Sequence, residues 1–166
     1  MARTKENIIA RKRTRTKYGV SITEAGIKRR TANDYYTGEP ITFDSELECR
    51  FYTEVVLKGL KDGTILKYKL QQKYNLQPSF KYMDSVTIRS IDYISDFDLW
   101  LADGRFIVLD TKGRATADAK IKKKLLHFKY PDLLFYWVSY TKETGWVTYE
   151  YLQKHRREKK KAKKVS

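Results

Sequence analysis

Cysteine, histidine and long apolar runs are scarce in this chain of 166 residues. The single cysteine, Cys49, excludes an internal disulfide and a cysteine-rich metal site, and this is typical of a reducing compartment. The two histidines, His127 and His155, are too far apart to form a predicted metal pair. No stretch approaches the roughly 18 apolar residues of a membrane span, and the basic N-terminus has no apolar signal region. We therefore expect a soluble, cytoplasmic protein.

Acidic residues are also few, because 20 Asp and Glu stand against 35 Lys and Arg and leave a net charge of +15. Most of this excess lies at the two ends of the chain: residues 1–17 carry +6 and residues 154–166 carry +7. Basic arms favour a polyanionic partner, since each Lys or Arg placed against a phosphate releases a condensed counterion. The pattern predicts binding to nucleic acid; tails that only improve solubility are the alternative.

The remaining sequence has the length and composition of one folded domain, with 41% hydrophobic residues available for its core. We divide the chain into a partly ordered basic N-terminal arm (1–40), a core (41–153) and a basic C-terminal tail (154–166). Ser45 and Glu48 form a capping box that opens a helix, and the helix ends near the Asp62-Gly63 turn. The apolar residues at helical spacing are Leu47, Phe51, Val55 and Val56.

Extended segments follow this helix. Leu66, Tyr68 and Leu70 alternate with polar residues in a half-exposed strand that closes by Pro78, and a further stretch from Phe80 turns near Asp84. The runs 91–101 and 105–111 are separated by Ala102-Asp103-Gly104, and Asp-Gly between two such runs predicts an antiparallel hairpin.

The C-terminal part of the core contributes a helix and two more strands. Thr116 caps a helix that ends before Pro131, and we expect Ile121, Leu125 and Phe128 to point inward. A buried strand over 132–140 and an edge strand over 145–149 follow. The order of helix, strands, helix and strand predicts an α/β fold with a mixed β-sheet flanked by helices.

Charged residues interrupt the two hairpin strands. Alternation puts Asp96 and Asp98 on one face of the first strand, and Asp110 and Lys112 on one face of the second. Strand pairing brings the two faces together. Two carboxylates bind Mg²⁺ through oxygen ligands, the ion activates water, and a nearby lysine stabilises charge on a phosphate. The pattern predicts metal-dependent phosphodiester hydrolysis, with a surface cross-strand ion pair as the alternative for Asp110 and Lys112.

At these residues the sequence resembles the PD-(D/E)XK nuclease superfamily, in particular a family of small phage-encoded nucleases. The D-x-K triplet alone is weak, but several segments match in order and spacing and cover about residues 41–135. They are "FDSELECRFY" (43–52), "LQPSFKY" (76–82), "IDYISDF" (91–97), "VLDTKG" (108–113) and "KLLHFKYP" (124–131). Ser95 stands where the superfamily name has proline, and Asp110 where Glu is more frequent.

The resemblance implies a restriction-endonuclease-like core that binds Mg²⁺ or Mn²⁺. It makes Glu48, Asp96 and Asp110 the metal ligands and Lys112 the catalytic lysine. Glu48 has a second interpretation as the acid of the capping box, and only the resemblance favours Asp96 over Asp98. Gln77 is a further catalytic candidate, because turn chemistry explains the neighbouring proline but not the glutamine.

The function we expect is a Mg²⁺-dependent endodeoxyribonuclease, phage-encoded and acting in the host cell cytoplasm. A Holliday-junction or other branched-DNA resolvase is the alternative, and a non-catalytic basic DNA-binding protein is the alternative from another class. Expected partners are DNA and, as further candidates, a second copy of the chain and phage replication, recombination or packaging proteins. The predicted nucleic-acid-binding residues are Lys120, Lys122, Lys123, Lys124, Arg156, Arg157, Lys159, Lys160 and Lys161.

Overall fold

The computed structural model describes residues 23–165, so most of the predicted N-terminal arm lies outside the described residues. The chain divides into two compact units, Met1–Cys49 and Arg50–Ser166. In the first unit, helix α1 (Glu24–Lys28) precedes a hairpin of β1 (Thr31–Asn33) and β2 (Pro40–Thr42). These are short ordered pieces, as the sequence predicts for residues 23–40.

The predicted capping-box helix forms, with the Ser45 hydroxyl accepting a hydrogen bond from the Glu48 amide at 3.1 Å. It consists of α2 (Glu46–Phe51), a π-helical turn η1 (Tyr52–Val56) and α3 (Leu57–Asp62). Gly63 ends it with a left-handed φ of +79°. Gly59 lies inside α3 because a Cβ there would come within 2.6 Å of the Ile65 side chain. Glycine thus permits close packing of helix against strand.

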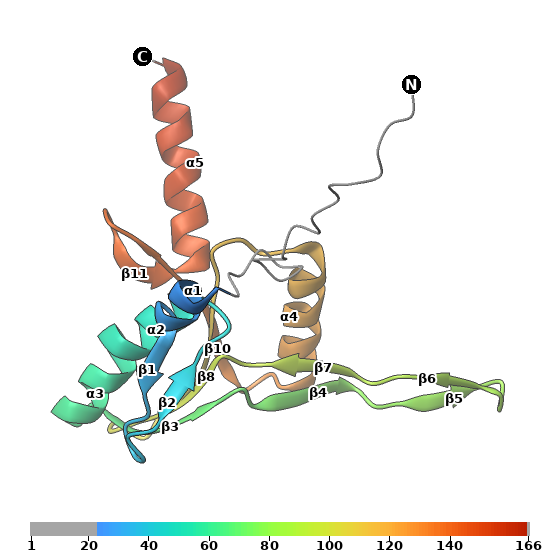
Figure 1. The fold of residues 1–166 in the computed structure, drawn as a ribbon. Helices are drawn as coiled ribbons and strands as arrows, with labels where there is room; N and C mark the ends of the chain where they lie inside the picture. Colours follow the sequence, from blue (N-terminus) through green and yellow to red (C-terminus); the bar gives the residue numbers. More distant parts are fainter. Residues whose placement is uncertain (1–22, 166) are drawn as a thin grey trace, which may run out of the picture. The chain divides into compact units, whose positions relative to one another are not determined.

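The second unit contains a mixed five-stranded sheet in the order β11-β10-β9-β8-β3 (Figure 1). Its neighbours are antiparallel except for β9 and β10, which run parallel. The strands are β3 (Ile65–Leu70), β8 (Phe97–Leu101), β9 (Phe106–Thr111), β10 (Leu134–Thr141) and β11 (Gly145–Thr148). The predicted β8–β9 hairpin and the edge strand β11 are confirmed, and so is the mixed α/β class.

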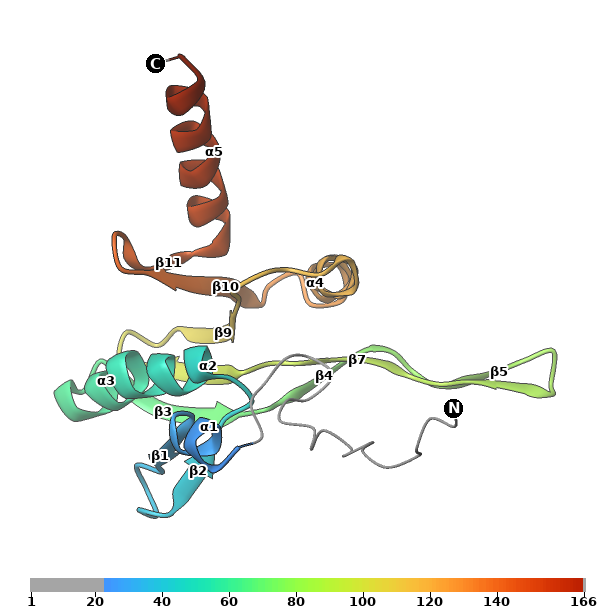
Figure 2. The same ribbon diagram turned by 45° about the horizontal axis from the view of Figure 1, so that its top comes forward.

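The strand predicted over 91–101 is not continuous. It breaks at Ser95 and Asp96, and its first part, β7 (Ile91–Ile94), leaves the sheet and pairs with β4 (Lys73–Gln77). A second pair, β5 (Phe80–Tyr82) and β6 (Val86–Ile88), extends this two-stranded ribbon away from the sheet (Figures 1 and 2). The turn at its tip has Met83 and Asp84 at positive φ, near the predicted position.

The prediction for the strand before the ribbon is wrong in two respects. This strand, β3, ends at Leu70 and not at Pro78, because Gln71 takes a left-handed φ of +54°. A β-bulge next to Ile65 also shifts the alternation. Ile65 and Tyr68 are buried, whereas Leu66 is 61% exposed.

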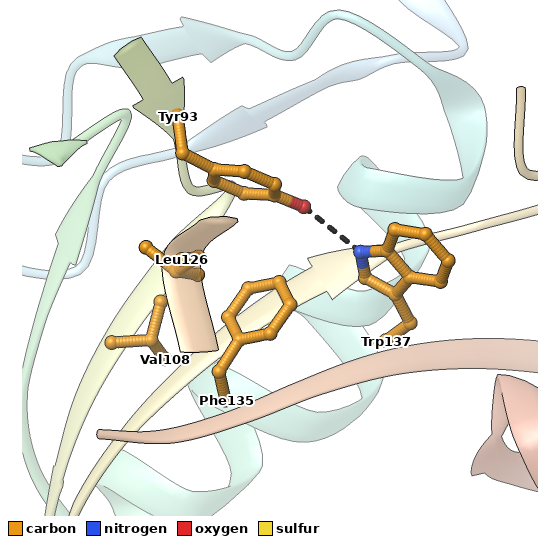
Figure 3. Packing of buried hydrophobic residues seen from close by; sticks show 5 residues of the cluster. All are labelled: Tyr93, Val108, Leu126, Phe135 and Trp137. Atoms are coloured by element: carbon orange, nitrogen blue, oxygen red, sulfur yellow. Dashed lines mark hydrogen bonds between the residues drawn. The ribbon is translucent and has the colours of Figure 1, made fainter. Parts of the chain in front are cut away.

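Two helices complete the second unit, α4 (Ala117–Lys129) and α5 (Tyr149–Val165). The Thr116 hydroxyl caps α4, as predicted, by accepting from the Ala119 amide at 3.2 Å. Of the three residues predicted to point inward from α4, Leu125 is half-buried, but Ile121 and Phe128 are 58% and 87% exposed, so the predicted face is wrong for these two. The buried residue is Leu126, which packs with Tyr93, Val108, Phe135 and Trp137 (Figure 3). Lysines 122 and 123 lie half-buried on the same side of α4.

The predicted C-terminal tail is the continuation of α5. Its buried residue Leu152 belongs to the first turns, which pack on β10 and β11. The helix then runs away from these strands in both views (Figures 1 and 2). Within residues 23–165 we find no helix with the length and apolar content that a membrane crossing requires.

Candidate functional site

Asp110, near the end of β9, is the centre of a buried hydrogen-bonded chain. Its Oδ2 accepts from the Tyr93 hydroxyl at 2.8 Å, and the Lys112 ammonium forms an ion pair with the same oxygen. The Tyr93 oxygen in turn accepts from Trp137 Nε1 at 2.8 Å (Figure 3). Asp110, Tyr93 and Trp137 are 2%, 5% and 3% exposed. The chain of contacts therefore lies almost entirely out of water.

The direction of these hydrogen bonds follows from the groups themselves. An indole N–H can only donate, so the single hydroxyl proton of Tyr93 is directed to Asp110. Burial and the negative charge of Asp110 raise the pKa of Tyr93, so it stays a neutral donor. The Tyr93 and Lys112 contacts both use Oδ2, so within the described part of the chain Oδ1 is the oxygen of Asp110 left for a further ligand.

Asp96 lies at the break before β8, next to the same segment of β9. Its Oδ2 accepts from the Thr111 amide at 2.7 Å and from the Thr111 hydroxyl at 3.0 Å. Thr111 is the residue between Asp110 and Lys112. The structure thus places Asp96, Asp110 and Lys112 around one short segment, as the hairpin pairing predicts.

Asp98 is also buried, but it makes different contacts. It accepts from the Tyr74 hydroxyl at 2.5 Å and from the Ser95 hydroxyl at 2.7 Å. Burial raises the pKa of Asp98, and the two hydroxyl hydrogen bonds act in the opposite direction. These contacts tie β4 to the break between β7 and β8. Asp98 therefore joins the break to the ribbon, whereas Asp96 joins it to the Asp110-Thr111-Lys112 segment.

The other two predicted catalytic residues, Glu48 and Gln77, belong to elements outside the Asp110-Thr111-Lys112 segment. Glu48 belongs to the first unit, where its carboxylate accepts from the Asp44 amide at 3.1 Å and from the Ser45 hydroxyl at 2.6 Å. The capping box is confirmed, and the metal role of Glu48 stays a prediction. Gln77 lies at the end of β4, opposite Ile91, and Ile94, the β7 residue nearest to Asp96 in the sequence, pairs at the other end of this ladder.

The predicted nucleic-acid-binding cations fall into two groups. Lys122 donates to the Asp92 carbonyl at 2.8 Å, Lys123 to Glu150 at 2.5 Å, and the exposed Lys159 pairs with Glu143, so these three have partners within the protein. The others are exposed to solvent: Lys120, Lys124, Arg156, Arg157, Lys160 and Lys161.

The donor set suits a hard divalent cation. The described residues contain no group of three or more His, Cys, Asp or Glu side chains placed to hold a metal ion. Mg²⁺ keeps several waters and binds through one or two carboxylates together with substrate phosphates, so a third protein ligand is not required. Asp96 and Asp110 are the residues that would hold it.

Sequence reasoning missed Tyr93, Trp137 and Thr111. Tyrosine and tryptophan in a buried strand read as core residues, and only their polar tips, which need partners when buried, signal another role. A cavity of about 640 Å³ lies elsewhere, between α3 and the sheet, and none of the predicted site residues lines it.

Comparison with known proteins adds a family but no activity. The family described as "Protein of unknown function (DUF1064)" matches residues 30–145. The chain belongs to this family. The match includes every predicted catalytic residue and excludes the basic end of α5. Neither the curated proteins nor the solved structures gave a match.

Proposed function

We propose that this DUF1064 protein is a metal-dependent endodeoxyribonuclease with a PD-(D/E)XK-type site. The observation that carries the proposal is the contact of Asp96 with the Thr111 amide. It brings the first acid beside the Asp110-Thr111-Lys112 triplet, although Asp96 and Asp110 are 14 positions apart. A D-x-K triplet that arose by chance would have no reason to lie beside a second carboxylate.

The order of the elements supports the proposal. A helix (η1 and α3) is followed by β3, by the ribbon strands β4 to β7, by β8 and β9, and then by α4 and β10. This order agrees with the restriction-endonuclease-like core that the sequence resemblance implies. The triplet lies at the end of a central strand, β9, which has a neighbour on each side.

The side chains have distinct roles in such a reaction. Asp96 and Asp110 would hold Mg²⁺ or Mn²⁺, which lowers the pKa of a bound water and neutralises charge that develops on the phosphate. Tyr93 and the Thr111 amide fix the orientation of the two carboxylates. Lys112 is 23% exposed, so its ammonium can reach a phosphate from its place beside Asp110. The net charge of +15 attracts DNA to the protein as a whole.

A panel of labelled duplex, single-stranded, flap and four-way-junction DNAs tests the proposal. We expect cleavage with Mg²⁺ or Mn²⁺, none with EDTA, and loss of cleavage in Asp110→Asn with DNA binding retained. Preference for the four-way junction would identify a resolvase. If the purified parent binds every substrate and cuts none, the chain is a non-catalytic DNA-binding protein and the proposal is wrong.

A further inference from the structure

A cavity of about 330 Å³ between α4 and α5 has an unusual lining. Three of its residues are cations: Lys120 from α4, and Lys154 and Arg157 from α5. Among residues 23–165 none of these three side chains forms an ion pair or a side-chain hydrogen bond that would neutralise it. Like charges at i and i+3 on a helix, such as Lys154 and Arg157, repel each other. An anion bound in the cavity would compensate these three charges.

The acidic residue in the lining does not supply that anion. Glu150 already accepts from Lys123 at 2.5 Å, and the Lys123 ammonium also lies 4.5 Å from the centre of the Trp137 ring. The carboxylate is therefore compensated by a cation outside the lining. The three lining cations keep their surplus positive charge.

The rest of the lining suits a nucleotide. Tyr149 and Trp137 form an aromatic pair with ring centres 5.7 Å apart, and Tyr149 is half-buried, so part of its ring remains accessible. The side-chain amide of Gln153 can both donate and accept hydrogen bonds, which suits the edge of a base. A cavity near 300 Å³ is at the lower end of small-molecule sites, larger than a phosphate alone requires.

The cavity adjoins the candidate site through Trp137. Trp137 on β10 pairs in register with Asp110 on β9, and its Nε1 donates to Tyr93, which donates to Asp110. Neighbouring strands lie roughly 4.8 Å apart. Trp137 thus connects the two: it lines the cavity, and its N–H belongs to the hydrogen-bonded chain that ends at Asp110.

We propose that this cavity binds one nucleotide unit of the DNA strand, with its phosphate on Lys120, Lys154 and Arg157 and its sugar or base on Tyr149. This inference rests on the proposed nuclease function and adds a subsite that holds the strand beside the acids. It separates the basic residues of α5 into two kinds: those that bind one phosphate in a fixed place and those that contribute only to the general positive field.

A charge-matched pair of double variants tests the subsite. Lys154→Ala with Arg157→Ala removes two lining cations, whereas Arg156→Ala with Lys163→Ala removes the same residue types from exposed positions of the same helix that do not line the cavity. Binding of a 20-base-pair duplex is measured in EDTA, without cleavage, together with binding of thymidine 5′-monophosphate and of thymidine. We expect the first variant to weaken duplex binding about tenfold or more, and the second by about threefold or less.

Thymidine 5′-monophosphate should bind the parent and the second variant but not the first, and thymidine should bind weakly to all three. Lys154→Gln with Arg157→Gln, which keeps most of the side-chain stems, should behave like the first variant. Equal losses in the two alanine variants overturn the inference, because the charges then act only through the general field. DNA cleavage is scored separately: a subsite without cleavage contradicts the proposed function alone, and cleavage with equal losses contradicts the subsite alone.

Discussion

Two buried aspartates on adjacent strands, Asp98 on β8 and Asp110 on β9, have similar burial and different partners. They are 3% and 2% exposed, and each accepts a hydrogen bond from a tyrosine. The second partner of Asp98 is the Ser95 hydroxyl, whereas that of Asp110 is the Lys112 ammonium. Burial alone therefore does not distinguish a structural carboxylate from a candidate catalytic one.

The two aspartates differ in whether an ion pair compensates their charge and in which elements their tyrosine partners connect. Tyr74 ties β4 to Asp98 at the break where the ribbon leaves the sheet. Tyr93 instead connects Asp110 to Trp137, at the wall of the cationic cavity. We conclude that Asp98 joins β4 to the break between β7 and β8, whereas Asp96 is held separately by the Thr111 amide and hydroxyl.

Replacing the acids one at a time should have the largest effect. We expect Asp96→Ala to lower cleavage at least about 100-fold, because it removes a proposed metal ligand. Asp98→Ala should keep most of the cleavage per folded molecule but lose about 2 kcal/mol of stability, since two hydroxyl groups lose their buried acceptor. Single-turnover cleavage and urea unfolding measure the two effects. Equal loss of cleavage in both variants, with intact circular dichroism, would contradict the distinction.

Removing Lys112, the cation paired with Asp110, tests how much this ion pair stabilises the fold. Lys112→Ala leaves a buried carboxylate with Tyr93 alone, and such losses cost about 3–5 kcal/mol in fully buried pairs. Because Lys112 is 23% exposed, we expect a smaller loss of about 2 kcal/mol in urea unfolding. The double variant Asp110→Asn with Lys112→Ala should recover part of this stability. A double variant no more stable than Lys112→Ala would show that the ion pair is not the source of the loss.

The two tyrosines offer the closest matched comparison. Tyr93→Phe leaves Asp110 and the Trp137 N–H each without this partner, and we expect about tenfold slower cleavage and a need for more Mg²⁺. Tyr74→Phe removes the same hydroxyl from Asp98 and should lower only stability. Cleavage measured across a Mg²⁺ series, with binding of the metal followed by tryptophan fluorescence, separates the outcomes. An unchanged Mg²⁺ dependence in Tyr93→Phe would make Tyr93 a packing residue.

The smallest expected effect is a pH dependence of stability from Asp98. Burial raises the pKa of Asp98 in the folded protein above its value in the unfolded chain. Between those two pKa values the folded state binds more protons, so this carboxyl stabilises the fold most below its unfolded pKa, near 4, and that contribution is lost as pH rises through the folded pKa. Asp98→Asn should remove this part of the pH profile of the unfolding free energy. Parallel profiles for parent and variant would contradict it.

The order of the core elements was predictable in part, because some of its signals are local; helix α5 and the separate ribbon strands β4 to β7 were not predicted. The capping residues Ser45 and Thr116 and the Asp103-Gly104 turn each determine a helix start or a hairpin from a few neighbouring residues. Which side of α4 faces the core was not predictable from local signals. Its inner side is formed by Leu126 together with the stems of Lys122 and Lys123, whose ammonium groups find partners on β7 and α5.

The site was predictable only in part. Pairing through the hairpin predicted that Asp96 meets Asp110 and Lys112, since the β8–β9 register places Phe97 opposite Leu109. Periodicity could not separate Asp96 from Asp98, because the break at Ser95 depends on the distant Tyr74 and on the Gln72 carbonyl, which accepts from the Ser95 amide at 2.9 Å. Contacts between residues more than 20 positions apart have no local signature.

The ribbon has a practical consequence for anyone handling the protein. Residues 78–87 are all exposed, and β5 and β6 pair with each other beyond the part of the ribbon that α4 supports. Exposed loop tips of this kind are preferred sites of proteolytic nicking and of tolerated insertions. A chain nicked at Asp84 would stay associated through the β4–β7 and β3–β8 pairs. The same tip is a natural place to attach a fluorophore, or to divide the gene into two fragments that reassemble.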